Sequence, residues 1–426
     1  VEFLVIMQAQ ADISAVKDIR KKEDKGRFLL QTLSAFAENT QRNVRDLLHN
    51  ADVPNQSFWV TNALWVKGNR ALIEQIAQLP EVGRLEINPV WHLNLPPQEF
   101  ENNTAQDRLT PLSWGLTKIN ADDVWNLGYT GSGIVIGGQD TGYEWSHPAL
   151  KNKYRGWNGS VADHNYNWHD AIHALIAGGA NSCGLNLDHP CDDTDHGTHT
   201  MGTMVGGTSA DSTFGVAPDA KWIGCRNMEE GDGTPATYIE CFQWFIAPTN
   251  IAGVNPDVSK APHVINNSWG CPASEGCNPS NYATMEGVVN NVRAAGIMVV
   301  VSAGNDGSAC STVNTPAAIY NGSYSVGATS NATNDAIAGF SSRGPVNVYT
   351  AIMKPDISAP GVGIPSCVGV NNNPGTYNYG SKSGTSMAGP HIAGVVALIL
   401  SARPDLIGDV DALENLINTT AVPRFA

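Results

Sequence analysis

Alternating apolar and polar residues open the chain and predict a small first unit. Five segments in turn have the period of a strand, a helix, a strand, a helix and a strand. These are the opening VEFLVIMQAQADIS, a helix with Leu29, Leu30, Leu33, Phe36 and Ala37 on one face, the aromatic run 56–66, the amphipathic stretch 71–79 and residues 82–87. We therefore expect a compact α+β module over residues 1–93.

Short, nearly continuous apolar runs that end in Gly, Asn or Asp dominate the chain from Trp114 onward. Such runs are typical of buried parallel strands. The clearest are 133–138 (GIVIGG), 221–224 (KWIG), 263–265 (HVI) and 297–301 (IMVVV). Helical patterns alternate with them, after His196 and over 238–246, 283–295 and 386–400. The alternation predicts an α/β domain over residues 111–426, with a mainly parallel sheet and helices on both faces.

The segment between the two units has the composition of a linker. Residues 88–110 mix Pro, Asn, Gln and Glu with little periodicity, which is typical of an exposed connection that proteases can cut. We place the linker at residues 94–110.

The charge of the chain excludes two classes of partner. Its 426 residues carry a net charge of -15. Residues 1–108 hold 12 basic and 14 acidic residues, whereas the rest holds 13 and 26. An acidic domain repels phosphate backbones and anionic lipid, so we expect neither nucleic acid nor a membrane surface as a partner. No run of about 18 apolar residues predicts a membrane span.

All eight cysteines lie between Cys183 and Cys367. The even count favours disulfides and an oxidising compartment, although buried thiols would give the same count. Short loop length favours the pairs Cys183–Cys191 and Cys271–Cys277. The spacing does not match a zinc site. Because the chain begins at Val1, we interpret it as a form whose signal peptide has been removed.

Four polar residues share one position in the predicted sheet. Asp140 and Asn305 follow apolar strands, whereas His196 and Ser386 lie in glycine-flanked turns at the start of predicted helices. All four should therefore meet at one rim of the sheet, beyond the carboxyl ends of the strands.

These residue types suit acyl transfer. A serine hydroxyl needs an imidazole to take its proton, and a buried carboxylate fixes the imidazole tautomer. We assign these roles to Ser386, His196 and Asp140. The Asn305 amide and the Ser386 backbone N–H are the candidate donors to the oxyanion of the tetrahedral intermediate.

Other interpretations of single residues stay open at this stage. A lone Asp after a strand is usually a turn residue, and a lone Ser before a helix is usually an N-cap. His196 and His199 could form a zinc pair, although we expect His199 to pack in the core. Asp195 could replace Asp140 as the partner of the imidazole. Otherwise, we interpret Asp193 and Asp195 as solvated loop charges or calcium ligands.

The chain resembles the subtilase family of serine peptidases. GGQDTG, DHGTHTMG and GTSMAGPH stand, in that order, where the family carries its Asp, His and Ser motifs, and SAGNDG stands at its oxyanion asparagine. Within the family, HPALKNKYRGWNGS and INNSWGCP resemble bacillopeptidase F-like enzymes.

The resemblance implies a secreted, monomeric serine endopeptidase that acts on proteins or peptides and needs no cofactor for catalysis. Residues 1–93 would be an inhibitory propeptide, with the cut between residues 100 and 110. A structural calcium ion is known among relatives, but the D-x-D-x-D-G loop that would prove one is missing here.

The resemblance also implies a substrate-binding surface. Ser268, Trp269 and Gly270 would pair with an extended peptide, and residues 302–304 would line the first specificity pocket. This last set is Ser302, Ala303 and Gly304. Asp306 near its mouth would favour a basic residue.

Two other functions remain. GTSMA nearly matches the G-x-S-x-G motif of esterases, but the order Asp, His, Ser does not fit that class. A latent binding protein whose N-terminal module never leaves the cleft is the second.

Overall fold

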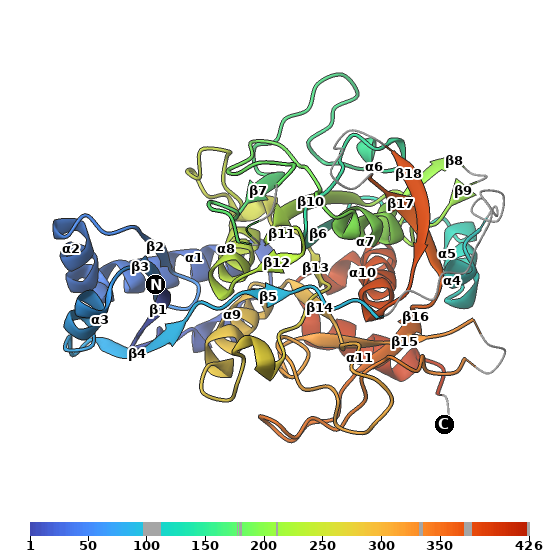
Figure 1. Cartoon of the computed structure of the whole chain (residues 1–426). Helices are drawn as coiled ribbons and strands as arrows, with labels where there is room; N and C mark the ends of the chain where they lie inside the picture. The colour runs from blue at the N-terminus through green and yellow to red at the C-terminus, as the bar shows by residue number, and fades with distance from the viewer. Residues whose placement is uncertain are drawn as a thin grey trace.

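A computed structural model describes residues 1–96, 112–176, 178, 181–209, 212–331, 335–369 and 377–423. It has a small N-terminal module beside a larger domain, and an extended segment runs from the module across the larger domain (Figure 1).

The N-terminal module is a four-stranded antiparallel sheet with the order β2-β3-β1-β4 and three helices. Its elements are β1 (Glu2–Met7), α1 (Lys22–Thr40), α2 (Arg42–Asn50), β2 (Asn55–Phe58), β3 (Ala63–Lys67), α3 (Arg70–Ile76) and β4 (Val82–Ile87). The aromatic run 56–66, which we expected as one strand, is a hairpin, because the chain turns at Asn62 with a positive φ of 45°.

Strand β1 alternates between two cores. Phe3, Val5 and Met7 pack with α2 and α3 inside the module. Leu4 and Ile6 point the other way, into a cluster that also contains buried residues of the larger domain. The period of two in the sequence therefore marks a strand that is buried on both faces.

The larger domain contains a seven-stranded, wholly parallel sheet with the order β16-β15-β14-β13-β6-β10-β7. Its strands are β6 (Val135–Asp140), β7 (Trp168–Asp170), β10 (Lys221–Arg226), β13 (Val264–Asn267), β14 (Met298–Ser302), β15 (Tyr324–Thr329) and β16 (Ile357–Pro360). The four predicted runs are the central strands, which confirms the predicted fold class.

Helices cover both faces of this sheet (Figure 1). On one face, α7 (His196–Val205), α10 (Thr385–Ala402) and α11 (Val410–Thr420) share an apolar cluster with the strands. On the other face, α8 (Pro235–Ile246) and α9 (Tyr282–Ala294) share a cluster with the N-terminal module. Helix α10 is long and apolar enough to cross a membrane by composition, but 78% of it is buried inside the protein. We therefore describe it as a core helix.

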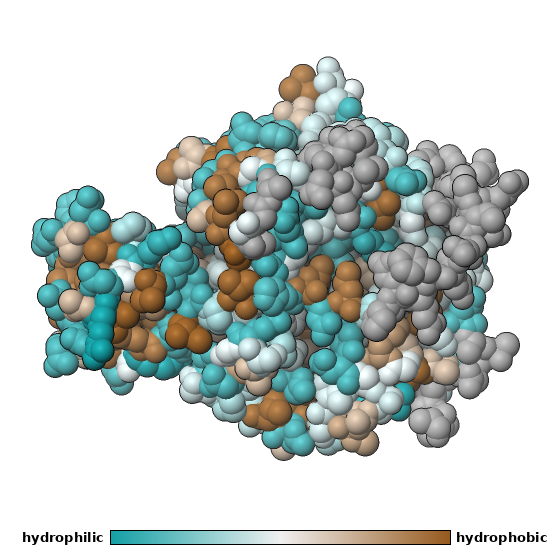
Figure 2. Space-filling model, viewed as in Figure 1, coloured by the Kyte–Doolittle hydropathy of each residue, from teal (hydrophilic) through white to brown (hydrophobic). Residues whose placement is uncertain are grey.

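Shorter elements complete the larger domain. These are α4 (Trp114–Lys118), α5 (Ala121–Asn126), α6 (Pro148–Lys151), the hairpins β8 (Gly207–Ser209) with β9 (Ser212–Thr213), β11 (Met228–Glu229) with β12 (Asp232–Gly233) and β17 (Ile364–Val368) with β18 (Asn378–Lys382), and β5 (Trp91–His92) of the crossing segment. On the face drawn in Figure 2, hydrophobic residues form small separate groups among hydrophilic ones.

Three disulfides brace the larger domain: Cys183–Cys191, Cys225–Cys241 and Cys271–Cys277. Both predicted pairs are confirmed. The third pair, which links β10 to α8, was not predicted. Cys310 and Cys367 are free thiols, so the even count does not mean that every cysteine is paired.

Candidate active site

Asp140 and His196 form a buried pair at the rim of the sheet. Asp140 is the last residue of β6 and His196 is the first residue of α7. The Nδ1 of His196 lies 2.7 Å from Oδ1 of Asp140, and each side chain is 1% exposed. When Nδ1 carries the proton, Nε2 is left as an acceptor. This is the protonation pattern that a general base needs.

Two further donors fix the Asp140 carboxylate. Its Oδ1 also accepts the Thr141 N–H at 2.8 Å, and its Oδ2 accepts the Thr200 hydroxyl at 3.2 Å. The carboxylate therefore cannot rotate away from the imidazole without breaking several hydrogen bonds.

His199 does not join His196 in a metal pair. It is fully buried, and its Nε2 donates to the Ile364 carbonyl at 2.9 Å. Burial lowers the pKa of His199 well below its ordinary value. The prediction of a core histidine is confirmed.

Our interpretation of Asp193 and Asp195 as solvated charges is wrong. Asp193 is 2% exposed and accepts Nη2 of the buried Arg226 at 2.7 Å. Asp195 forms an ion pair with Lys382 and precedes α7 in a left-handed conformation. Within the described ranges, no group of three or more His, Cys, Asp or Glu side chains is arranged to hold a metal ion. Because these two carboxylates already bind cations of the protein, they do not fit the calcium role, and a structural calcium ion elsewhere stays a prediction.

Ser386 lies in the first turn of α10, which packs against α7. It is 3% exposed, and its hydroxyl donates to the Ser268 carbonyl at 3.5 Å. In the part of the chain that the structure describes, Nε2 of His196 has no hydrogen-bond partner. The serine and the imidazole thus come from adjacent helices but do not hydrogen bond in this state. Such bonds are often long before a substrate binds.

Asn305 has one function at each end of its amide. Its Oδ1 accepts the N–H and the hydroxyl of Thr385, at 2.9 and 3.0 Å, next to the serine. Its Nδ2 donates to the Asn94 carbonyl at 2.9 Å. The α10 terminus therefore orients the asparagine so that its N–H groups point at a peptide carbonyl of the crossing segment.

A pocket beside Ser386 collects most of the predicted substrate-binding residues. Its lining includes Ser268, Trp269, Gly270, Ser302, Gly304, Asn305, Asp306 and Ser386, together with Leu93 and Asn94. Ala303 is not among the lining residues; it is buried, and its N–H donates to the Val326 carbonyl. Asp306 lies in this pocket as expected, and burial raises its pKa.

The crossing segment lies in the groove as an extended peptide. Strand β5 pairs antiparallel with β12, so that Trp91 is opposite Gly233, and the Leu93 N–H donates to the Gly231 carbonyl at 2.8 Å. We expected a linker in this region, but residues 91–96 are bound across the rim. The expected cut between residues 100 and 110 lies outside the described residues.

An aromatic cage holds the first residue of this segment. Trp91 is 3% exposed, stacks on Trp269 at 5.8 Å between ring centroids and contacts Tyr238 at 5.1 Å. An indole of this size is the kind of anchor that dominates interface free energies.

The body of the module docks on α8 and α9. The Gln243 side chain accepts the N–H groups of Trp59 and Val60 at 2.7 and 3.1 Å. The Asn88 side chain accepts the Ala236 N–H at 3.1 Å, in the first turn of α8. Because helix starts leave N–H groups without partners, this contact satisfies a donor of the larger domain.

Sequence reasoning missed two parts of the site. The hairpin of β11 and β12, which pairs with the segment, turns at Glu230 and Gly231 with φ values of 49° and 89°. The run EEGDG carries the glycine signal for such a turn. The second part is Asp192, which no motif singled out. It accepts hydrogen bonds from the hydroxyl of Thr141, next to Asp140, and from the N–H of Asp195, next to His196.

Comparison with known proteins agrees with this geometry. The model of the subtilase family matches residues 131–425, so the chain belongs to this family of subtilisin-like serine peptidases. The predicted family is confirmed, and the esterase interpretation is wrong.

Particular relatives cover most of this chain. Bacillopeptidase F of Bacillus subtilis (strain 168) is 37% identical over 93% of this chain, which spans 26% of that relative. Subtilisin E of the same organism is 28% identical over 88% of this chain and 79% of its own length. An extracellular protease of Xanthomonas campestris pv. campestris is 32% identical over 82% of this chain and 57% of its own length.

Proposed function

We propose that this chain is a serine endopeptidase that cuts peptide bonds of proteins through an acyl-enzyme. Ser386 attacks the carbonyl carbon while His196 takes the hydroxyl proton, and Asp140 stabilises the imidazolium. Asn305 donates to the oxyanion. His196 then returns the proton to the leaving amine, and water repeats the cycle on the ester. No cofactor enters these steps.

One observation carries this proposal. The Asn305 amide, held by the residue before Ser386, donates to a peptide carbonyl of a chain segment in the groove. A carbonyl in that position would have the serine beside it and the donor already aimed at its oxygen.

We further propose that the chain is made as a zymogen inhibited by its own N-terminal module. The same contact supports one particular bond as the one that would be cut. With the Asn94 carbonyl at Asn305, the scissile bond would be Asn94–Leu95. This bond lies in the 94–110 linker but before the 100–110 stretch that the family resemblance implied. The module would end near Asn94 and remain docked on α8 and α9 after the cut.

Two observations bear on the compartment in which the enzyme acts. Three disulfides favour an oxidising compartment, and one relative is named an extracellular protease. We therefore propose secretion. We also propose that the chain acts as a monomer on extended protein or peptide segments.

The test uses the full chain and a Ser386→Ala variant. We expect the wild type to cut itself, to give a large fragment that begins at Leu95, and to digest casein in a way that a phenylmethylsulfonyl reagent blocks. The variant should stay at full length. N-terminal sequencing and mass spectrometry report the cut. Equal processing and digestion by the variant would contradict the proposal, and a wild type that stays whole and inert would favour a latent binding protein.

A further inference from the structure

Asp192 lies between the two elements that carry the catalytic pair. It follows Cys191 directly and is 6% exposed. Its backbone forms a bridge with Gly142, just beyond the end of β6, and the Tyr143 N–H donates to the Cys191 carbonyl at 3.1 Å. Gly142 has a φ of +110°, and a Cβ there would lie 1.8 Å from the Cys191 carbonyl oxygen. Only glycine allows this close approach.

One oxygen of the Asp192 carboxylate holds the end of β6. Its Oδ1 accepts the Thr141 hydroxyl at 2.8 Å, and Thr141 is the residue after Asp140. The same hydroxyl accepts the Gly197 N–H at 3.0 Å, next to His196. Oδ1 also accepts the N–H groups of Thr194 and Asp195, at 3.2 and 3.0 Å.

The other oxygen holds the start of α7. Its Oδ2 accepts the Thr198 N–H at 2.8 Å and the Thr198 hydroxyl at 2.5 Å. The Thr198 N–H belongs to the first helical turn, where N–H groups have no partner within the helix. A carboxylate at this end is also favoured by the helix dipole.

We propose that Asp192 is a positioning residue for the reaction. It clamps the strand end beside Asp140 to the helix start beside His196, and so keeps the imidazole aligned with the Asp140 carboxylate. It does not touch the reacting atoms.

The chemistry of the side chain explains why a carboxylate is needed. Five donors converge on its two oxygens, three on Oδ1 and two on Oδ2. An amide of the same shape offers one acceptor oxygen. Its NH₂ group would face either the two donors of Thr198 or the three donors of Thr141, Thr194 and Asp195. The helix start or the strand end would then move.

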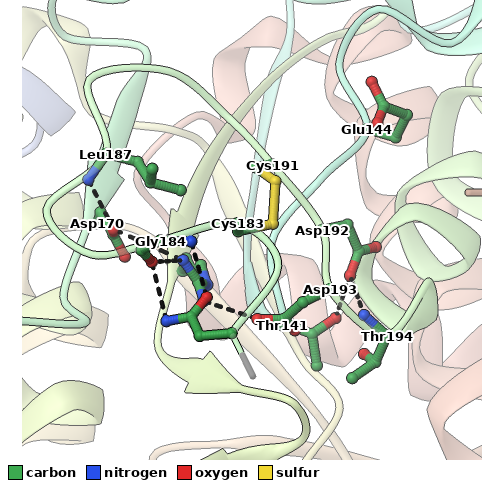
Figure 3. Close-up of a disulfide and its surroundings, with 12 residues drawn as sticks. Thr141, Glu144, Asp170, Cys183, Gly184, Leu187, Cys191, Asp192, Asp193 and Thr194 are labelled. Carbon is green, nitrogen blue, oxygen red and sulfur yellow. Dashed lines mark hydrogen bonds and ion pairs between the residues drawn. A yellow bond between two sulfur atoms is a disulfide. The ribbon is translucent and has the colours of Figure 1, made fainter. Parts of the chain in front are cut away.

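The neighbouring disulfide holds the backbone of Asp192. Cys191 is bonded to Cys183, and Asp193, on the other side, binds the buried Arg226. Figure 3 shows the disulfide, Asp192 with its partners Thr141 and Thr194, and Asp193 in one small region. The carboxylate is thus fixed from both flanks, as expected of a group that sets a geometry.

The experiment rests on the proposed function and compares Asp192→Asn with the wild type. The probe is a peptide with the sequence Trp-His-Leu-Asn before p-nitroanilide, and the second readout is the first-order rate of self-cutting in the refolded full chain. We expect kcat and the self-cutting rate to fall about 10- to 100-fold, the scale of a displaced catalytic group, with KM within about twofold. Asp188→Asn, an exposed residue in the same disulfide loop, is the matched control and should behave as wild type.

A double variant separates positioning from a general loss of stability. If Asp192 acts through the catalytic pair, Asp140→Asn with Asp192→Asn should be no slower than Asp140→Asn alone. Multiplied losses, or an unchanged kcat in Asp192→Asn, would overturn the proposal. If Asp192→Asn does not fold, Thr141→Val replaces it, because this change removes the hydroxyl that Asp192 binds at the strand end. Asp140→Asn with Thr141→Val should then be no slower than Asp140→Asn alone. Multiplied losses in this double variant would also overturn the proposal. A wild type inert on casein would instead refute the proposed function.

Discussion

The two halves of the active site are held in different ways. Among the described residues, Asp140 and His196 are buried and hydrogen bond to groups of their own domain, at distances of 2.7 to 3.2 Å. Asn305, in the other half, donates its amide N–H to the carbonyl of Asn94 in the crossing segment. The acid–base half is therefore assembled within the larger domain, whereas the amide donor of the oxyanion half is occupied by the crossing segment. If the chain is a zymogen, as we propose, its activation would empty the groove and leave the Asp140–His196 pair as it is.

The largest effect should come from the complete half. Asp140→Asn keeps the shape of the side chain but favours the wrong imidazole tautomer. We expect kcat on the p-nitroanilide peptide to fall about 10⁴-fold, the loss known for this change in a serine protease of another fold. The melting temperature should change little. A loss below tenfold would mean that His196 is held by something other than Asp140.

The oxyanion half should give a smaller loss. For Asn305→Ala we expect turnover to fall about 10²- to 10³-fold, a figure carried over from a subtilisin, which is a relative. KM should change less than kcat, because the donor acts on charge that develops in the transition state. Turnover equal to the wild type would remove Asn305 from this role.

The binding of the N-terminal module to the larger domain can be weakened by a substitution in the crossing segment. Trp91→Ala empties the aromatic cage, and we expect the cut module to inhibit about 100-fold less well, in line with the loss of a central interface tryptophan. The onset of casein digestion after self-cutting should come earlier by a similar factor. Ile73→Ala, on the partly buried α3 of the module, is the matched control. An equally early onset in both variants would point to loss of module stability instead.

The smallest effect concerns pH. Lys22 on α1 is buried against the larger domain, where its ammonium donates to the Ala261 carbonyl at 3.0 Å, and burial lowers its pKa to about 8. An undocked Lys22 keeps its proton up to its ordinary pKa of 10.5, so docking should strengthen as the pH rises from about 8 to 10.5 and be constant below 8.

Melting of the uncut Ser386→Ala chain between pH 7 and 10.5 measures this dependence. Other groups titrate in the same range, so we compare that chain with one that also carries Lys22→Met. The informative quantity is the difference between their free energies of unfolding. We expect the difference to change by no more than about 3 kcal/mol. A difference that does not vary with pH would show that Lys22 does not titrate with docking.

The local sequence pattern predicted the central strands of the parallel sheet and missed the outer ones. The four central strands each carry an apolar run because both faces of the sheet are buried, and the ends of β6 and β14 locate Asp140 and Asn305. The outer strands β7 (WHD) and β16 (ISAP) have only three and four residues and no continuous apolar run, so periodicity could not find them. His196 was preferred over His199 because it stands at a predicted turn, and the burial of His199 agrees with that choice.

Long-range pairing accounts for the remaining misses. Asp193 reads as a loop charge because its partner Arg226 is 33 residues away. Residues 91–96 read as a linker because β5 finds its partner strand about 140 residues further along the chain. Composition describes what a segment is made of, but not the surface that it will meet.

The core shared by β1, α8 and α9 has a thermal consequence. Leu4 and Ile6 complete an apolar cluster that belongs partly to the larger domain, so departure of the module exposes hydrocarbon to water on both partners. Association of the two should therefore carry a negative heat-capacity change and weaken on cooling. If the module is cut from the chain as we propose, the cut module would then dissociate more readily in the cold than at higher temperature, the reverse of what a purely hydrogen-bonded interface would do.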